Sequence, residues 1–399
     1  MNRNLSLCRK TAIALFSRIA LKPLCLLPIR KNRVLFQSFL EKQYACNPRY
    51  ICEELQRLAG DKLEIAWSFR RPEDFRYLKE KGVRVLKSGS REALLYALTA
   101  RVICVNTYYK PTHPRRRGQF YLRTWHGGGA YKRVGKMSRM PLPERAFTAL
   151  QQSGASLYLS SSRAFTELTL RDSFGYRGEV LEMGMPRNDI LISGGTEALK
   201  SRIRAELGLR DGEKLVLYAP TYRADTRAHA FGLDGERLTG ALSRRFGGVW
   251  KLAYRSHHVT MYRENGENTR GAIDCTNYPD MQELLLVADA LVTDYSSCMW
   301  DMSLTFKPVF LYCPDLNEYR AERDFYTDIR SWPFPLAENN GELAENIRVF
   351  DEAAYRAACK RHHDELGSFE TGRASRAAAE RIMRECGLEV PREDAGGTA

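Results

Sequence analysis

The sequence predicts an α/β protein with two doubly wound domains and a basic amphipathic helix at the amino terminus. Short apolar runs alternate with helix-like segments, which is typical of parallel sheets. This pattern restarts after the turn-rich Ser193-Gly194-Gly195, which indicates a second domain. Eight basic residues and no acidic residue precede Glu41. A chain of 399 residues is long enough to bury two cores.

The composition is that of a folded, globular protein. Hydrophobic residues make up 44% and charged residues 28%, which excludes collagen-like, low-complexity and wholly disordered chains. The 62 basic and 48 acidic residues give a net charge of +14, which favours nucleic acid, a membrane surface or a phosphorylated substrate as partner. The ten cysteines form no C-x-x-C pair, which argues against a zinc site or a disulfide framework and fits a reducing cytoplasm.

Residues 1–32 are predicted to form a basic amphipathic segment that associates with membranes. Basic residues and prolines interrupt the apolar stretch 11–29, so it is too short to span a bilayer, and no signal-peptide cleavage site follows it. On a helical wheel Leu15, Phe16 and Ile19 share one face, and basic residues lie toward the other. Such a helix can lie in the interface of an anionic leaflet. The alternative is an ordinary helix docked on the protein.

The two domains are predicted over residues 33–195 and 196–390, and residues 391–399 are predicted to be a disordered tail. Strands of the first domain are expected at 34–39, 63–69, 83–87, 101–106, 120–126, 156–161 and 179–184. Strands of the second are expected at 214–221, 249–257, 272–276, 289–294 and 308–312. Helices are expected at 48–59, 72–81, 90–99, 162–172, 196–207, 234–246, 280–287, 296–304 and 341–366. Ligands of such sheets bind at the carboxyl ends of the strands.

The segment RTWHGGGAYKRVGK places His126 at the carboxyl end of an expected strand. Gly127 and the two glycines after it allow a ligand to approach the backbone, and Lys132 can neutralise a phosphate. An imidazole with an ordinary pKa of about 6.5 suits a general base that takes a proton from an alcohol. The segment alone fits equally well a glycine turn beside a structural histidine.

The segment VADALVTDYSSCMWDMS is more specific. A buried strand leads into Asp294, and Ser296 and Ser297 open an expected helix. The amides and hydroxyls of such a turn can bind an anion such as a diphosphate. Helix capping by Asp294 or Ser296 is the alternative.

Three further turns follow expected strands and place polar residues toward a common cleft: Arg187 and Asn188, Thr221 and Arg223, and Arg255 and His257. Each turn alone is typical of a surface loop. Five polar clusters at the carboxyl ends of strands together indicate one site. Four histidines lack such a setting and are interpreted as surface residues: His113, His229, His362 and His363. No cluster has metal-ligand spacing.

These motifs resemble the CDP-glycerol glycerophosphotransferase family, the teichoic-acid primases and polymerases of bacterial walls. The resemblance runs from about residue 34 to about residue 330 and rests on the segments 37–55, 125–136, 184–191, 218–223, 255–258 and 288–328. It implies two Rossmann-like domains that face each other across a cleft in the GT-B arrangement, with the nucleotide held by the second domain. It implies that His126 and His257 are catalytic. The implied CDP-alditol and phosphate-binding residues are Thr221, Arg223, Arg255, Asp294, Ser296 and Ser297.

The resemblance further implies a transferase that moves glycerol phosphate from CDP-glycerol to a hydroxyl of a membrane-linked acceptor and releases CMP, without a cofactor or metal. The acceptor is expected to be a lipid-linked glycan or polyol phosphate, and the acceptor side of the cleft is expected to contain Gly127, Lys132, Arg187 and Asn188. The enzyme is expected to be cytoplasmic and peripheral on the inner face of the bacterial cell membrane, with an anionic membrane surface as a partner.

Several alternatives stay open. The donor can be CDP-ribitol, or the product a capsule polymer. A sugar-nucleotide glycosyltransferase of the same architecture would be expected to place a carboxylate where DYSS offers hydroxyls and amides. A non-catalytic module that binds polyanions or membranes would explain the charge alone. Nucleic acid is not an expected partner, because the sequence contains no recognisable reader module.

Overall fold

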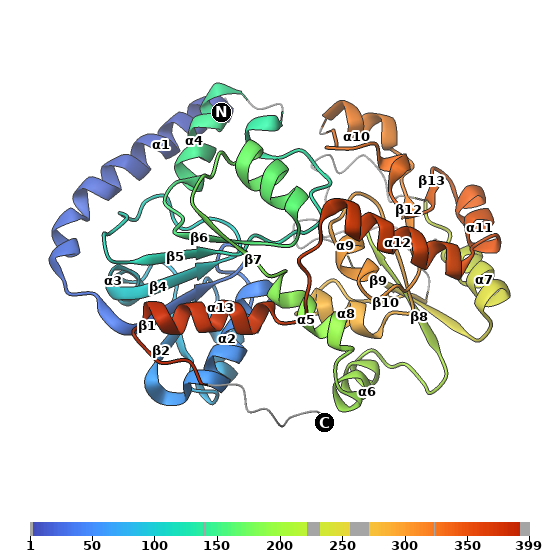
Figure 1. Ribbon diagram of the computed structural model, residues 1–399, viewed down its shortest axis with the longest axis horizontal. Coiled ribbons are helices and arrows are strands. Elements are labelled where there is room, and N and C mark those ends of the chain that lie inside the picture. The colour runs from blue at the N-terminus through green and yellow to red at the C-terminus, as the bar shows by residue number, and fades with distance from the viewer. Residues whose placement is uncertain (1–2, 139–140, 222–231, 256–270, 323, 392–399) are drawn as a thin grey trace.

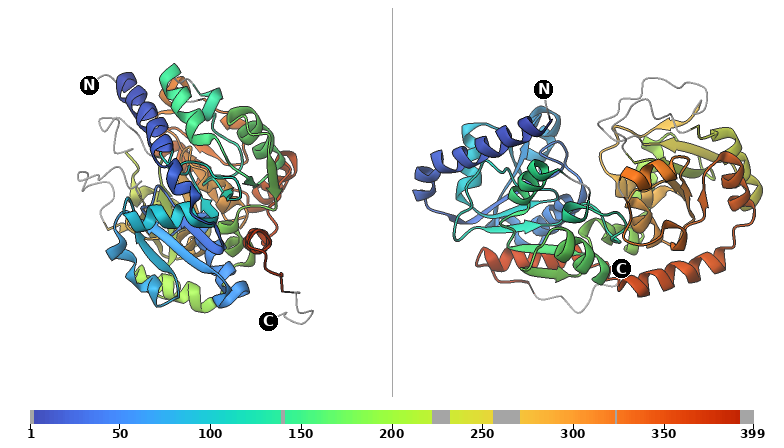
Figure 2. Two further views of the ribbon diagram at one scale, coloured as in Figure 1. Left: turned by 90° about the vertical axis from the view of Figure 1, so that its left-hand side faces the viewer. Right: turned by 90° about the horizontal axis from the view of Figure 1, so that it is seen from above.

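The computed structural model describes residues 3–138, 141–221, 232–255, 271–322 and 324–391. Within these ranges two parallel sheets lie side by side, each packed against helices (Figures 1 and 2). We call the part built on the first sheet the first half and the part built on the second sheet the second half. The predicted α/β fold with two doubly wound units is confirmed.

The first sheet orders its seven described strands β3-β2-β1-β4-β5-β6-β7, and all neighbours are parallel. In register, Val34 pairs with Ile65 on one side and with Val102 on the other. The order reverses between β1 and β4, so the carboxyl ends of these two strands border a topological switch point. The strands are β1 Arg30–Gln37, β2 Glu64–Phe69, β3 Arg84–Lys87, β4 Ala100–Val105, β5 Phe120–Arg123, β6 Leu157–Ser160 and β7 Glu179–Glu182.

The second sheet repeats this winding in the order β10-β9-β8-β11-β12-β13, counted over the described ranges. Its switch point lies between β8 and β11, whose register pairs Thr293 with Ala219. The strands are β8 Lys214–Ala219, β9 Trp250–Tyr254, β10 Ile273–Asp274, β11 Ala290–Thr293, β12 Val309–Tyr312 and β13 Leu336–Ala337. Each expected strand corresponds to an observed one, and β13 is an addition.

Most expected helices are present, and the single helix expected at 341–366 is two. The Asp351 side chain accepts a hydrogen bond from the Ala354 amide at 2.9 Å, so a new helix begins there. The expected helix at 162–172 is a π-helix, η5, and that at 72–81 is 3₁₀, η3. The α-helices are α1 Arg3–Ala20, α2 Cys46–Ala59, α3 Arg91–Thr99, α4 Leu142–Gln152, α5 Asp189–Ser193, α6 Glu197–Glu206, α7 Gly235–Phe246, α8 Met281–Val287, α9 Cys298–Ser303, α10 Leu316–Glu322, α11 Asn340–Arg348, α12 Glu352–Leu366 and α13 Ala374–Glu385. The remaining helical turns are η1 Lys22–Leu26, η2 Gly60–Lys62, η3 Pro72–Lys79, η4 Gly135–Met137, η5 Phe165–Ser173, η6 Pro186–Asn188 and η7 Ile329–Ser331.

The last helix returns to the first half. Helix α13 lies along α2 (Figure 1), and Ala378, Ile382 and Met383 are buried in the apolar core that contains Trp67. The domain limits 33–195 and 196–390 stay predictions, yet the range 196–390 includes this helix. The carboxyl-terminal segment therefore ties the two halves together.

Helix α1 docks on the first half through one narrow side. Ala14 is 1% exposed, and the Arg18 Nε donates to the Pro111 carbonyl at 2.7 Å. Leu5, Phe16 and Ile19 are 67%, 73% and 63% exposed. The apolar side of the helix thus faces solvent, and α4 runs beside it (Figure 1). In the described ranges no helix has the length and apolar character needed to cross a bilayer.

Candidate active site at the junction of the halves

His126 follows β5 and is half-buried at the junction of the halves. Its Nδ1 lies 3.0 Å from the carbonyl oxygen of Asn106, the residue that follows β4. Because a carbonyl only accepts, Nδ1 carries the proton in the neutral ring and Nε2 carries the lone pair. The rings of Trp125 and Phe39 flank the imidazole, at centroid distances of 4.4 and 5.8 Å. Neutral His126 thus presents one basic nitrogen in a fixed orientation.

The side chain of Asn106 holds the turn that carries Phe39. Three successive residues of this turn, 39–41, have φ values of 43°, 57° and 67°, in a region that residues other than glycine rarely adopt. The Asn106 Oδ1 accepts from the Phe39 amide at 2.8 Å, and its Nδ2 donates to the Ser38 hydroxyl at 3.1 Å. Asn106 therefore couples the orientation of His126 to a strained turn. No sequence motif indicates this residue.

The glycines after His126 approach the second half closely. A Cβ added at Gly127 would lie 3.0 Å from the Ser297 hydroxyl, and one at Gly128 would lie 2.5 Å from Cδ1 of Trp300. The second distance is one that real Cβ atoms essentially never show, so a side chain at position 128 would force the buried Trp300 indole to shift. We expected the glycines to make room for a ligand. At Gly128 the space that a side chain would need is filled by the Trp300 indole and not left for a ligand. The close approach of Gly127 to Ser297 places His126 next to the DYSS turn.

The loop after the glycines enters the second half. Lys132 forms an antiparallel bridge with Phe325, and the Tyr326 amide donates to the Tyr131 carbonyl at 2.9 Å. The Tyr131 ring is buried in the core of the second half, where its hydroxyl lies 3.0 Å from Nε2 of His362. Lys132 is thus located at the junction, with its backbone bound to the second half, and its role toward the acceptor stays a prediction.

Arg187 joins the two halves from a buried position. Its Nη1 donates to the His126 carbonyl at 2.7 Å, and its Nη2 lies 2.8 Å from an Asp301 carboxylate oxygen. The residue is only 5% exposed. We expected Arg187 to face an anionic acceptor at the cleft mouth; instead its charge is balanced by Asp301, and it holds the backbone of His126 against α9.

Asn188 lies beside Arg187 and contacts Glu370, a residue that no sequence motif indicates. The Asn188 Nδ2 and the Trp300 Nε1 donate to Oε1 of Glu370 at 2.9 and 3.0 Å, and the Met185 amide donates to Oε2 at 3.0 Å. Burial raises the pKa of Glu370 to about 7, although these three hydrogen bonds favour the anion. Asn188 is fully buried and therefore lines no open surface.

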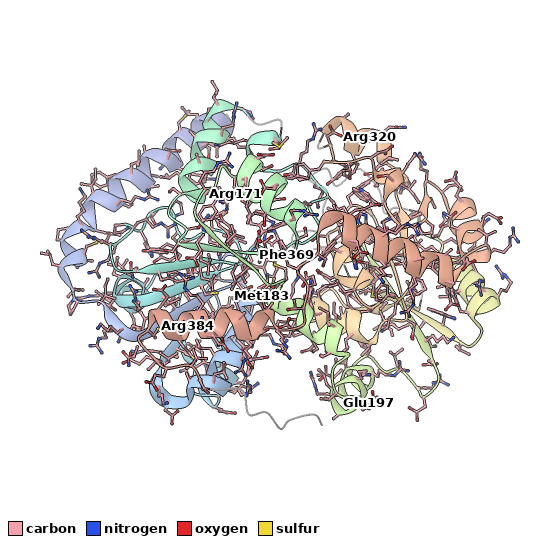
Figure 3. The ribbon with its side chains drawn as sticks, in the orientation of Figure 1. Arg171, Met183, Glu197, Arg320, Phe369 and Arg384 are labelled. Carbon is pink, nitrogen blue, oxygen red and sulfur yellow. The ribbon has the colours of Figure 1, made fainter. Side chains whose placement is uncertain are left out.

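The segment that carries Glu370 crosses the carboxyl ends of β6 and β7. The Phe369 amide donates to the Ser161 carbonyl at 2.8 Å, and the Thr371 hydroxyl donates to the Met183 carbonyl at 3.3 Å. Figure 3 shows Phe369 and Met183 at the junction. No local sequence pattern indicates this crossing.

In the second half, Thr221 and Asp294 join the loops that follow β8 and β11. The Thr221 amide and hydroxyl donate to Oδ1 of Asp294 at 2.8 and 2.5 Å, and the Tyr295 amide donates to the same oxygen. Asp294 is 2% exposed. We expected its carboxylate among the phosphate-binding groups; the structure uses it to hold the Thr221 loop. Ser296 and Ser297 follow and are half-buried.

Arg255 follows β9, as expected, and is half-buried. Its Nη1 is buried and has no hydrogen-bond partner among the residues that the structure describes. Burial lowers the pKa of this guanidinium, and the nearby Asp280 opposes that effect. Arg223, His229 and His257 lie outside the described residues.

Three histidines that we expected on the surface are at least half-buried. His362 contacts Tyr131, His363 Nε2 lies 2.8 Å from the Ser303 hydroxyl, and His113 is half-buried. Burial lowers the pKa of each to about 4, so all three are neutral near pH 7. The surface prediction is wrong for these residues. Helix α12 packs His362 and His363 against Tyr131 and Ser303, and His113 packs against the buried Tyr109.

Comparisons with known proteins agree with the motifs. The family model for CDP-Glycerol:Poly(glycerophosphate) glycerophosphotransferase matches residues 19–384. A teichoic acid poly(glycerol phosphate) polymerase of Bacillus spizizenii is 28% identical over 397 residues, which cover 94% of this chain and 98% of the relative. A teichoic acid glycerol-phosphate transferase of Staphylococcus aureus is 29% identical over 369 residues, which cover 89% and 93%.

A solved structure is also similar along most of the chain. The wall teichoic acid polymerase TagF aligns with a TM-score of 0.79 at 26% identity and covers 96% of each chain. The GT-B type arrangement implied by the motifs is confirmed. The family model alone spans far more than half of the sequence. The chain therefore belongs to the CDP-glycerol:poly(glycerophosphate) glycerophosphotransferase family.

Proposed function

We propose that His126 is the general base with which this glycerophosphotransferase transfers glycerol phosphate from CDP-glycerol to a hydroxyl of a membrane-linked acceptor. The observation that carries the proposal is the position of His126. Its Nδ1 is oriented by the Asn106 carbonyl at 3.0 Å, and the next residue, Gly127, faces Ser297 of the second half. A base and an anion-binding turn thus adjoin one another.

Phosphoryl transfer needs alignment, charge neutralisation and a route for the acceptor proton. Nε2 of His126 accepts the proton of the acceptor hydroxyl while the oxygen of that hydroxyl attacks the β-phosphorus of CDP-glycerol. The new P–O bond forms as the bond between the β-phosphorus and the bridging oxygen breaks, and CMP leaves with that oxygen and its electron pair. The proton then passes from His126 to solvent.

The donor diphosphate binds the second half in this proposal. The hydroxyls and amides of Ser296 and Ser297 contact it, and the buried Nη1 of Arg255 is a donor without a protein partner in the described ranges. Arg223 stays a predicted donor contact, and His257 stays a predicted catalytic residue that stabilises the diphosphate as CMP leaves. Thr221 acts together with Asp294 to position the loop.

The transferase reaction is tested by the release of CMP. Purified enzyme is incubated with CDP-glycerol or CDP-ribitol and a synthetic lipid-linked acceptor, and the products are analysed by mass spectrometry. The proposal expects CMP and an acceptor heavier by one or more glycerol phosphate units. Transfer from CDP-ribitol but not from CDP-glycerol would show that CDP-ribitol is the donor. The absence of CMP release from both donors would contradict the proposal.

The same proposal brings the enzyme to the inner face of the cell membrane as a peripheral protein. Phe16 and Ile19 of α1 are 73% and 63% exposed, and Arg9, Lys10 and Lys22 are exposed on or next to the same helix. Exposed apolar side chains beside basic ones favour binding to an anionic leaflet.

Vesicle binding tests this attachment. We expect Phe16→Ser with Ile19→Ser to weaken binding to anionic vesicles roughly tenfold or more, because burial of each apolar side chain is worth about 1.5–3 kcal/mol. Val249→Ser is a matched control, because Val249 is 60% exposed in the second half. Equal vesicle binding by the α1 variant and the control would dismiss the attachment.

A further inference from the structure

A groove lies beside α4 in the first half. It encloses about 570 Å³ between one face of α4 and the residues that follow η5. Ala146 and Ala149 form part of one wall, Phe174 and Tyr176 form the other, and Leu142 stands at the rim with 77% of its surface exposed. We call this space the α4 groove. Its walls are apolar enough to bind a hydrocarbon chain.

The charged residues of the α4 groove are all basic. Lys136, Arg145 and Arg177 line it and are exposed, and none of its described lining residues is acidic. The Lys136 ammonium lies against the backbone of Gly175, where no side chain intervenes. None of the three forms an ion pair with any residue in the described ranges. Three unpaired cations over an apolar floor are complementary to an anionic amphiphile.

The α4 groove is one aromatic layer away from His126. Phe174, a lining residue, lies 4.8 Å from the Trp125 ring by centroids, and Trp125 lies 4.4 Å from the His126 ring. On its other side α4 runs along α1, whose apolar side chains are exposed (Figure 1). The groove therefore lies between the surface proposed to meet the membrane and the proposed base.

We propose that the α4 groove binds the phosphate-bearing end of the lipid-linked acceptor. Arg145 and Arg177 bind the phosphate oxygens, and the first carbons of the lipid chain lie along the alanines of α4 and the Phe174 ring. The rest of the chain stays in the membrane beneath α1, and the acceptor hydroxyl reaches His126 past Trp125. This assignment rests on the proposed function and adds the place at which the acceptor is recognised.

The test is the variant Arg145→Gln with Arg177→Gln. Both side chains are exposed, so the fold should not change. The KM for the lipid-linked acceptor should rise roughly tenfold or more, because two charge-assisted hydrogen bonds to the phosphate are lost. The KM for CDP-glycerol, kcat and binding to anionic vesicles should stay the same. Arg320→Gln is the control, since Arg320 is exposed on the second half (Figure 3).

A direct binding measurement separates this site from the reaction. Farnesyl diphosphate serves as the probe in calorimetry with the full chain, with saturating CDP present to occupy the proposed donor site, and inorganic diphosphate is the second arm. The site predicts that the double variant binds farnesyl diphosphate roughly tenfold more weakly. It also predicts that inorganic diphosphate binds far more weakly than the lipid.

Three outcomes would overturn the assignment: unchanged farnesyl diphosphate affinity in the double variant, equal binding of inorganic diphosphate, or a loss of vesicle binding that accounts for the acceptor effect. Lack of CMP release by the wild-type enzyme would contradict the proposed function, and the probe affinities would still decide whether the groove binds a lipid phosphate.

Discussion

Gly127 of the first half meets Ser297 of the second half so closely that a Cβ on the glycine would lie 3.0 Å from the serine hydroxyl. The residue before Gly127 is the proposed base, and Ser297 belongs to the proposed anion-binding turn. Three further side chains hold the same junction through hydrogen bonds: Tyr131 to His362, Arg187 to Asp301, and Glu370 to Trp300. Contacts between the halves thus determine the relative position of the proposed base and the proposed donor site.

Substitution of Gly128 tests this junction by adding one carbon. Its φ is not in the left-handed region, so Gly128→Ala acts through contact with Trp300 at 2.5 Å. We expect a loss of about 1–3 kcal/mol in the free energy of unfolding and a lower kcat. Gly240→Ala is the control, because its nearest neighbour is 3.4 Å away within α7, and it should stabilise the protein by about 0.4–1 kcal/mol. A fully active and stable Gly128→Ala variant would disprove the close packing.

Asn106→Ala should impair catalysis through the position of His126. The change removes the hydrogen bond to the Phe39 amide, so the strained turn can relax and the imidazole moves. We expect kcat to fall roughly 10–100-fold with the KM for CDP-glycerol unchanged. The control Gln119→Ala removes a buried amide at the opposite end of β5, which bonds the Ala97 and Ala100 carbonyls, and should lower only the stability. Equal kcat values for the two variants would remove the positioning role.

Arg187→Met should destabilise the protein by about 3–5 kcal/mol, because it leaves the buried Asp301 carboxylate without its charged partner. The double variant Arg187→Met with Asp301→Leu should recover much of this loss, since both charges are then gone. Urea unfolding followed by tryptophan fluorescence measures both. A small change in stability with a selective rise in the acceptor KM would restore the role that the sequence suggested, contact with an anionic acceptor.

Glu370 should make stability depend on pH. Its pKa rises from 4.5 in its ordinary state to about 7 in the fold, so between these values the folded protein binds the proton more tightly than the unfolded chain. Stability from this group is complete below pH 4.5 and declines as the pH rises to 7. In Glu370→Gln the drop in unfolding free energy from pH 5 to pH 8 should shrink by about 1–3 kcal/mol. Equal slopes for variant and wild type would contradict the raised pKa.

The sequence was sufficient for the described strands other than β13, because apolar runs bounded by turns are local signals; β13 has only two residues, too few to form such a run. It also located the loops of the site, since ligands of parallel sheets bind at the carboxyl ends of their strands. The break at Asp351 had a readable signal, an aspartate at a helix start, which the long periodic pattern of 341–366 obscured.

The contacts between the halves could not be predicted from local pattern. Glu370 is one carboxylate in an irregular segment, and its role depends on Trp300 and Met185, distant in the chain. Arg187 and Asp294 were recognised as polar residues near the site, but their burial against Asp301 and Thr221 depends on packing. The contact of Trp300 with Gly128 could not be predicted either, because it too joins segments that are distant in the chain.

The most direct test of the central claim is CMP release by His126→Ala, measured together with its affinity for CDP-glycerol. Loss of the imidazole removes the acceptor for the hydroxyl proton and leaves the donor contacts of the second half in place. We expect transfer to fall by roughly 10²–10⁴-fold while the CDP-glycerol affinity stays near that of the wild type. Turnover retained near the wild-type rate would show that His126 is not the base.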